Sequence, residues 1–275
     1  MDVQLIAGDS MNLINPIDRR ALREQVRSSK PFPNLCLDNF LSPQFAEQVC
    51  HAFPSFDDAK KIGRVFSAVN EKGKVQVVES EKFSPPCAQL NQALASQEFL
   101  DLLSYAFEIP NLLADSDLVG GGLHQTGPQG HLDVHVDFNY LEQRSLHRRL
   151  NILVYFNKDW SEEWGGRVEL WDRDVKVCHH SYLPILNRCI VFETSEISFH
   201  GVTAVKCPAG VSRKSFAAYY YTREAPPDWK GKSHSTMFKA RPDEKLKGAL
   251  LMPAEKAVRW TRWILHEAKR TLRGG

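Results

Sequence analysis

Two histidine–aspartate pairs with the same spacing follow each other closely in the chain: His131 with Asp133, and His135 with Asp137. In an extended strand, side chains two positions apart lie on the same face, so each pair would present an imidazole beside a carboxylate. The same alternation places all four side chains on one face, and strand periodicity therefore does not choose between the pairs. Apolar residues flank the second pair, whereas the first pair begins at a turn. A buried setting suits a metal site, which favours His135 and Asp137.

Other segments of the chain contain residues that could complete such a site. Two histidines and one carboxylate are the ligand set of non-haem Fe(II) oxygenases, and this set leaves coordination positions open for a co-substrate and O₂. His200 is the best candidate for the third ligand, because it follows the apolar segment 188–193 and precedes Gly201, which allows close backbone approach. Arg213 begins a later apolar segment, where its guanidinium would suit a two-point ion pair with a dicarboxylate.

The elements that must position these residues change in type along the chain. Apolar residues at helical spacing predict helices over about 16–27, 43–53 and 88–107, while 54–86 is charged and irregular. From about residue 117 the period becomes that of strands, and short apolar runs alternate with turn signals. Such a series of strands is typical of a β-sandwich or barrel rather than of a parallel sheet with crossover helices.

Four separate blocks of the sequence, in this order, resemble the Fe(II)- and 2-oxoglutarate-dependent dioxygenases of the prolyl-hydroxylase type. They are GHLDVHVDFN, HRRLNILVYFNKDWSEEWGGRVELWD, NRCIVFETSEISFHGV and SRKSFAAYYYT. The resemblance covers about residues 117–223, with supporting similarity at PNLCLDNFLSPQ. It implies a mainly β fold, a double-stranded β-helix or jelly roll, with helices packed against one face.

The family pattern also assigns roles to individual residues of this chain. His135, Asp137 and His200 match the metal ligands. Arg213 matches the basic residue that binds the distal carboxylate of 2-oxoglutarate, and Tyr155 matches a tyrosine that commonly hydrogen-bonds the same carboxylate. The resemblance therefore implies a complete set of groups for a metal and its co-substrate.

The same resemblance implies the cofactors and the reaction. Where many relatives carry a tyrosine on the first strand, this chain has His124 and Gln125, and we expect Gln125 to contact the co-substrate. The implied cofactors are Fe(II), 2-oxoglutarate and O₂, with ascorbate as a supporting reductant. The implied reaction is hydroxylation of an unactivated C–H bond, most closely that of a prolyl or other residue in a peptide or protein. Asp137 favours this outcome, because related halogenases lack the carboxylate.

Several alternatives stay open at this point. The substrate could instead be a free amino acid or a natural-product intermediate, and desaturation or ring formation could use the same ligands. In other classes of protein, the chain would be a non-catalytic jelly-roll binding module, or a zinc hydrolase with the same three ligands. Dependence on 2-oxoglutarate separates the hydrolase from the oxygenase, since a hydrolase has no use for Arg213.

The composition narrows the class of protein further. The chain has 275 residues, and Lys+Arg 35 against Asp+Glu 33 leaves a formal charge of +2, too balanced to indicate nucleic acid or a membrane surface as a partner. No apolar run approaches the length of a membrane span, and the start lacks the features of a secretory signal. We therefore expect a cytoplasmic protein whose six cysteines are reduced.

The pattern also divides the chain into three regions. We expect an N-terminal extension over 1–30, the dioxygenase domain over 31–225, and a C-terminal extension over 226–275 that packs on the core. The last region ends in a basic amphipathic helix, roughly 254–272, with two open interpretations. It either packs on the core with a solvated basic face, or docks an acidic partner, a peptide substrate or the second copy of a homodimer.

Overall fold

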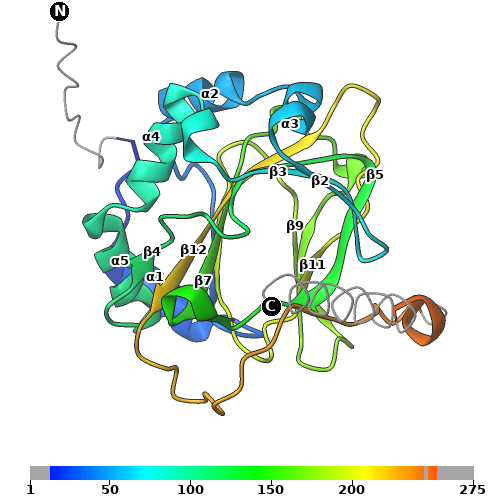
Figure 1. Cartoon of the computed structure of the whole chain (residues 1–275). Helices are drawn as coiled ribbons and strands as arrows, with labels where there is room; N and C mark the ends of the chain where they lie inside the picture. Colours follow the sequence, from blue (N-terminus) through cyan, green and yellow to red (C-terminus); the bar gives the residue numbers. More distant parts are fainter. Residues whose placement is uncertain (1–12, 245–246, 253–275) are drawn as a thin grey trace, which may run out of the picture.

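A curled antiparallel sheet forms the centre of the computed structural model, which describes residues 13–244 and 247–252 (Figure 1). Along the main path of this sheet, the strands are β1 (Asn34–Leu37), β10 (Cys189–Glu193), β7 (Leu146–Tyr155), β12 (Arg213–Thr222), β5 (Gly122–Val136), β11 (His200–Val202), β8 (Val168–Trp171) and β9 (Cys178–Tyr182). Shorter strands pair with this path or with each other: β2 (Arg64–Ser67), β3 (Glu71–Val77), β4 (Leu113–Ala114), β6 (Tyr140–Leu141) and β13 (Met237–Phe238).

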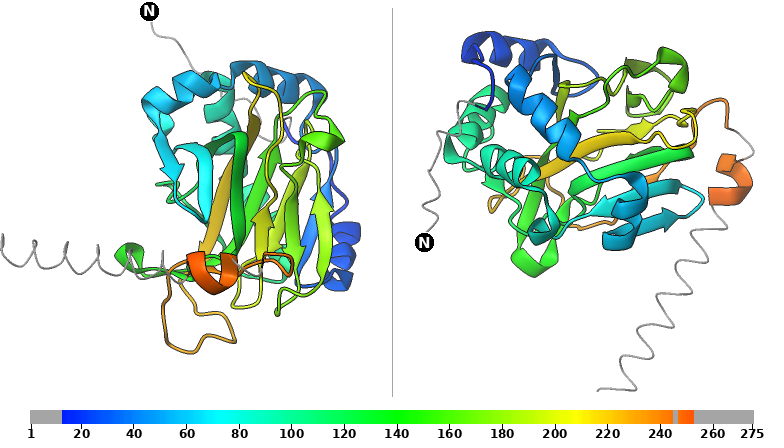
Figure 2. Two further views of the ribbon diagram at one scale, coloured as in Figure 1. Left: turned by 90° about the vertical axis from the view of Figure 1, so that its right-hand side faces the viewer. Right: turned by 90° about the horizontal axis from the view of Figure 1, so that it is seen from above.

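The long strand β5 joins the two halves of this sheet. Its residues 122–126 pair with β12, and its residues 132–135 pair with β11. The strand bends between them, around Gly127 and Gly130, so two apolar runs that the sequence separates by a turn are one continuous strand. The halves β1-β10-β7-β12 and β11-β8-β9 then face each other (Figure 2). This is the predicted double-stranded β-helix, and the fold class is confirmed.

Helices cover the outer face of the half that contains β7 and β12 (Figure 1). They are α1 (Arg19–Ser28), α2 (Pro43–Ala52), α3 (Phe56–Ile62), α4 (Pro85–Leu94) and α5 (Gln97–Phe107). Alternate residues of β7, Leu150, Ile152 and Val154, point toward these helices and are fully buried. Each such side chain contributes about 1.5–3 kcal/mol to folding. The other face of β7 is left for the interior of the β-helix.

The segment from 88 to 107 differs from its prediction, because it forms two helices instead of one. Ser96 lies between α4 and α5, and its hydroxyl accepts a hydrogen bond from the backbone N–H of Phe99 at 3.3 Å. Serine competes for backbone groups in this way and therefore favours a new helix start over helix continuation. Residues 54–86 are also more regular than expected, since they contain α3, β2 and β3.

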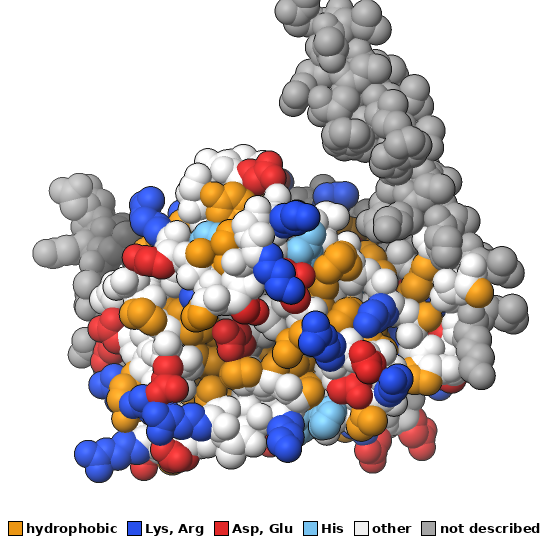
Figure 3. All heavy atoms as spheres, turned by 90° about the horizontal axis from the view of Figure 1, so that it is seen from below, with side chains coloured by type: hydrophobic (Ala, Val, Ile, Leu, Met, Phe, Trp, Pro, Cys, Tyr) orange, Lys and Arg blue, Asp and Glu red, His pale blue; other side chains and the backbone are white. Residues whose placement is uncertain are grey.

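The chain beyond β12 passes along the rim of the β-helix. There β13 pairs with the end of β5, so that Met237 lies opposite Val136 and Phe238 opposite His135. The predicted helix at 254–272 lies outside the described residues. Viewed from below, this end of the molecule carries basic and acidic side chains interspersed with apolar ones (Figure 3). Within the described ranges, no helix has the length and apolar character that crossing a membrane requires.

Candidate metal and co-substrate site

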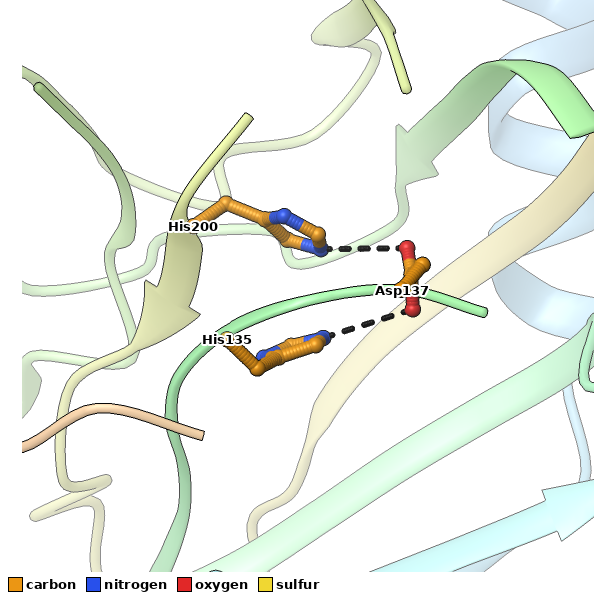
Figure 4. Close-up of side chains that lie close together, drawn as sticks. All are labelled: His135, Asp137 and His200. Atoms are coloured by element: carbon orange, nitrogen blue, oxygen red, sulfur yellow. Dashed lines mark ion pairs between the residues drawn. The ribbon is translucent and has the colours of Figure 1, made fainter. Parts of the chain in front are cut away.

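Three of the predicted site residues lie together inside the β-helix (Figure 4). His135 is near the end of β5, Asp137 follows that strand directly, and His200 begins β11. Both imidazoles point at the same carboxylate: Nε2 of His135 lies 3.4 Å from Oδ1 of Asp137, and Nε2 of His200 lies 3.4 Å from Oδ2. The pairing of His200 with His135 across the two strands produces this arrangement.

The tautomers of the two histidines suit metal binding. Nδ1 of His135 lies 2.8 Å from the carbonyl oxygen of Asp133, and Nδ1 of His200 lies 2.9 Å from that of Ser198. A carbonyl oxygen only accepts, so each Nδ1 carries the proton and each Nε2 keeps its lone pair for a metal. Two neutral imidazoles with one carboxylate are the ligand set of non-haem Fe(II) sites, and the residues present fit this metal.

The electrostatics keep the site in its metal-binding protonation state. Burial by itself raises the pKa of Asp137, but the nearby Arg148 and His200 more than offset this, and the pKa lies well below its ordinary range. Burial and the neighbouring His135 lower the pKa of His200 below its ordinary 6.5, against the opposing effect of Asp137. A charged carboxylate beside a neutral imidazole is the state that metal binding requires.

The structure does not bring the alternative pair, His131 and Asp133, to this site. The register between β5 and β11 shifts between the pairs His200–His135 and Val202–Leu132, which marks a β-bulge. Strand alternation therefore does not continue from one histidine–aspartate pair to the other. The buried Asp133 carboxylate instead contacts Lys247, and Nε2 of His131 donates to the backbone carbonyl of Val69.

Arg213 and Tyr155 form a second buried polar group. Nη2 of Arg213 donates to the hydroxyl of Tyr155 at 3.1 Å, and its Nε donates to the backbone carbonyl of Gly166 at 2.7 Å. Burial lowers the pKa of Arg213 below its ordinary range and raises the pKa of Tyr155 to about 12. Among the described residues, no carboxylate forms an ion pair with this arginine. A buried guanidinium in this condition is suited to bind an anion.

Register places this arginine on the same face as the metal site. Tyr155 lies opposite Ser215, and Ser215 is two residues from Arg213, so all three side chains share one face. Asn151 shares the face of Tyr155 on β7, and its side-chain amide donates to Asp137 at 2.7 Å. The candidate anion site and the candidate metal site therefore open into one interior.

Gln125 lies on the opposite face from this interior. It pairs with Lys214, whose side chain alternates with that of Arg213. Its amide nitrogen donates to the carbonyl of Pro54 at 2.9 Å, and its amide oxygen accepts from Ser212 at 2.7 Å. Gln125 thus forms its hydrogen bonds away from the expected co-substrate site. The neighbouring His124, which lies opposite Ser215, faces the interior instead.

Aromatic residues that the sequence reasoning did not select also border the histidines. The ring centroid of Phe192 lies 4.6 Å from that of His200, and the ring centroid of Phe238 lies 5.4 Å from that of His135. Phe192 belongs to the continuous buried run 189–192 of β10, and such an apolar run could have indicated a buried position. Phe238 lies in a polar, proline-rich segment where no sequence signal marks it.

Comparison with known proteins agrees with this geometry. Residues 121–221 match the family model of the 2OG-Fe(II) oxygenase superfamily. Over these residues the chain is similar to that superfamily, and the similarity implies Fe(II), 2-oxoglutarate and O₂ as metal, co-substrate and oxidant. The matched residues include His135, Asp137, His200, Tyr155 and Arg213.

Several proteins similar to this chain are prolyl hydroxylases. Mouse (Mus musculus) prolyl 3-hydroxylase OGFOD1 is 32% identical over 78 residues, which are 27% of this chain and 14% of that protein. The chain thus aligns with only a small part of that relative. A Pseudomonas putida prolyl-4-hydroxylase shares the fold with a TM-score of 0.53 and 17% identity, covering 74% of this chain and 99% of the other. A Trichoplax adhaerens prolyl hydroxylase, in complex with a peptide fragment of hypoxia inducible factor, shares it with a TM-score of 0.54 and 16% identity, covering 74% and 88%.

Proposed function

We propose that this protein is a 2-oxoglutarate- and Fe(II)-dependent dioxygenase that hydroxylates an unactivated C–H bond of a prolyl or other amino-acid residue in a peptide or protein. The observation that carries this proposal is the buried Arg213, which has no carboxylate partner among the described residues and faces the same interior as the three candidate metal ligands. The mouse relative and the Trichoplax structure support a peptide or protein as the substrate.

In this proposal each part of the site has a separate task. His135, Asp137 and His200 hold the metal, while Arg213 and Tyr155 bind the distal carboxylate of 2-oxoglutarate. When bound, Fe(II) with 2-oxoglutarate and O₂ supplies oxidative decarboxylation to succinate and CO₂, with transfer of the other oxygen atom to the substrate. The buried walls of the interior exclude water, which strengthens the ion pair at Arg213 and protects the reaction from side reactions.

The same observation weighs against the two other classes of protein. A zinc hydrolase would need the three ligands but not an anion site at Arg213. A binding module that had lost catalysis would not need both histidines to keep Nε2 free for a metal. A site that combines both features is therefore best explained by a reaction that consumes a dicarboxylate at a metal.

Turnover of the co-substrate tests this proposal directly. The protein is incubated with Fe(II), 2-oxoglutarate, ascorbate and a set of proline-containing peptides, with free amino acids as a parallel set. We expect succinate formation coupled to a mass gain of one oxygen atom in a peptide. If a free amino acid is oxidised and none of the peptides is, the substrate is a small molecule instead. Fe(II) binding without any effect of 2-oxoglutarate would contradict the proposed reaction.

We also propose a reducing compartment, the cytoplasm, as the location of the protein. All six cysteines are free thiols, and burial raises the pKa of Cys36 to about 11. Free thiols are typical of compartments that keep cysteines reduced. Fractionation of the source cells tests the compartment, and the elution volume of the purified protein tests whether it forms a homodimer.

A further inference from the structure

We propose that Arg148 and Asn151 are positioning residues that fix the Asp137 carboxylate, so that its Oδ1 alone is offered to the metal. This inference rests on the proposed function, since it concerns the same metal site. Neither residue is a candidate ligand, because a guanidinium has no free lone pair and the Asn151 amide is engaged elsewhere. Both would act through Asp137.

Hydrogen bonds among the three side chains carry the proposal. Oδ2 of Asp137 accepts from Nδ2 of Asn151 at 2.7 Å and from Nη2 of Arg148 at 3.0 Å. The amide oxygen of Asn151 in turn accepts from Nε and Nη2 of Arg148, at 3.0 and 2.8 Å. The three side chains thus form a closed cycle in which each one fixes the orientation of the next.

The two oxygens of Asp137 differ as a consequence. Each oxygen lies 3.4 Å from one histidine, Oδ1 from Nε2 of His135 and Oδ2 from Nε2 of His200 (Figure 4). Oδ2 in addition has two hydrogen-bond donors, whereas Oδ1 accepts none from the described residues. A carboxylate with one oxygen occupied in this way has a single oxygen left for a metal. Binding through one oxygen keeps coordination positions available for the co-substrate and O₂.

Two aromatic rings also contact Arg148. Its guanidinium lies 3.5 Å from the ring centroid of Tyr219 on β12 and 4.5 Å from that of Phe138. The residue is buried, so these cation–π contacts are made away from water, where they are strongest. A lysine would keep the charge but not the flat group that packs on aromatic rings and donates to two residues at once.

Asp137 needs such support because of its position in the chain. It follows the last residue of β5, in a segment without regular secondary structure. The backbone ladder therefore does not hold it as it holds His135 and His200. Asn151, in contrast, lies inside β7, which is paired on both sides by β10 and β12. The side-chain amide of Asn151 thus links the Asp137 carboxylate to the central sheet and restricts its motion.

Variants of the two residues test the proposal by metal binding rather than by turnover. Fe(II) is titrated without oxygen into the wild-type protein and into Arg148→Gln, Arg148→Lys and Asn151→Ala. The readouts are the Fe(II) affinity and the visible absorption that appears when a 2-oxo acid chelates Fe(II). Arg149→Gln is the matched control, because Arg149 is the next residue of β7 and is buried, but it contacts Thr222 and Glu193 instead.

We expect Arg148→Gln and Asn151→Ala to weaken Fe(II) binding by about 10- to 100-fold and to shift the absorption band, as for other residues that orient metal ligands. Arg148→Lys should restore part of the affinity but not the wild-type band, because one ammonium group cannot reproduce the geometry. Arg149→Gln should bind like the wild type. Wild-type affinity and absorption in both Arg148→Gln and Asn151→Ala would overturn the proposal.

The failure of the proposed function would give a different result. In that case, the wild-type protein itself would bind Fe(II) without any new absorption on addition of 2-oxoglutarate. Thermal unfolding of each apoprotein, followed by circular dichroism, shows whether a variant is folded. Should Arg148→Gln fail to fold, Asn151→Ala decides the question, because it removes all three hydrogen bonds of the amide but no charge.

Discussion

Nη2 of Arg213 lies 3.1 Å from the hydroxyl of Tyr155, and no ion pair among the described residues satisfies the charge of this arginine. A buried charge of this kind is costly unless a counter-ion joins it. We expect a bound anionic ligand to be the counter-ion of Arg213, because the free energy gained when the ion pair forms then contributes to binding affinity. Several consequences can be measured.

Truncation of Arg213 should greatly weaken binding of 2-oxoglutarate. Loss of one member of a buried ion pair costs roughly 2–5 kcal/mol, which is about 30- to several-thousand-fold in the dissociation constant. Fe(II) affinity should change little, since Arg213 is not a candidate ligand. Calorimetric titration of Arg213→Ala measures both, with Lys214→Ala as the control on the opposite face. Unchanged binding in Arg213→Ala with loss in Lys214→Ala would assign the anion site to Lys214.

Replacement of any one candidate ligand should abolish metal-dependent activity. His135→Ala, Asp137→Ala and His200→Ala each remove one of three donors, and the two that remain hold Fe(II) weakly. Metal content after dialysis, measured by atomic absorption, checks the expectation. His131→Ala is the matched control, because it removes the corresponding histidine of the other histidine–aspartate pair, which has the same spacing in the sequence. Loss of Fe(II) from the control with retention in His135→Ala would mean that the other pair binds the metal.

Gly166→Ala should weaken 2-oxoglutarate binding through displacement of Arg213. A Cβ at this position would lie 3.0 Å from Cδ of Arg213, and the glycine has a φ of +65°. Gly210→Ala separates the steric effect from the backbone strain, because that glycine has a φ of +84° and nothing within 4 Å of a Cβ. Both variants should lose stability. A loss of 2-oxoglutarate affinity of equal size in both would refute the contact-based explanation.

Acid should destabilise the apoprotein partly through His124. Burial, and then the charges of Lys74 and Arg213, hold the pKa of this imidazole well below its ordinary 6.5. Below pH 6.5 the unfolded chain therefore binds a proton that the folded protein does not, and stability falls as the pH falls. One such group contributes at most about 1.4 kcal/mol per pH unit.

Urea unfolding at several pH values between 5 and 7.5, about one unit to either side of the ordinary histidine pKa, measures this effect. His124→Gln should reduce the pH dependence of the free energy of unfolding. The exposed His179 on β9 supplies the control, and His179→Gln should leave the dependence as in the wild type. An unchanged dependence in His124→Gln would show that the folded protein binds this proton as readily as the unfolded chain does.

Much of the candidate site follows from local sequence. His135, Asp137, His200 and Arg213 lie in or directly after apolar segments, and the strand period determines which neighbours share a face. The alternation of β7 likewise separates residues that face the helices from Tyr155 and Asn151, which face the interior. These features depend on side-chain order along single strands, and the sequence contains that order directly.

Strand periodicity did not choose between the two histidine–aspartate pairs. The apolar neighbours of the second pair and the family resemblance favoured His135 and Asp137, and tertiary structure supplies the geometric reason. The two-residue repeat of a strand puts both pairs on the same face. The β-bulge opposite β11 breaks this repeat, so that Asp133 contacts Lys247 while Asp137 lies beside His135 and His200. Pairing between distant strands likewise placed His124 rather than Gln125 inside. The cycle of Arg148, Asn151 and Asp137 has the same origin, since it joins β7 to the end of β5. Such contacts depend on the register between strands, a long-range property that the residues of one strand do not determine by themselves.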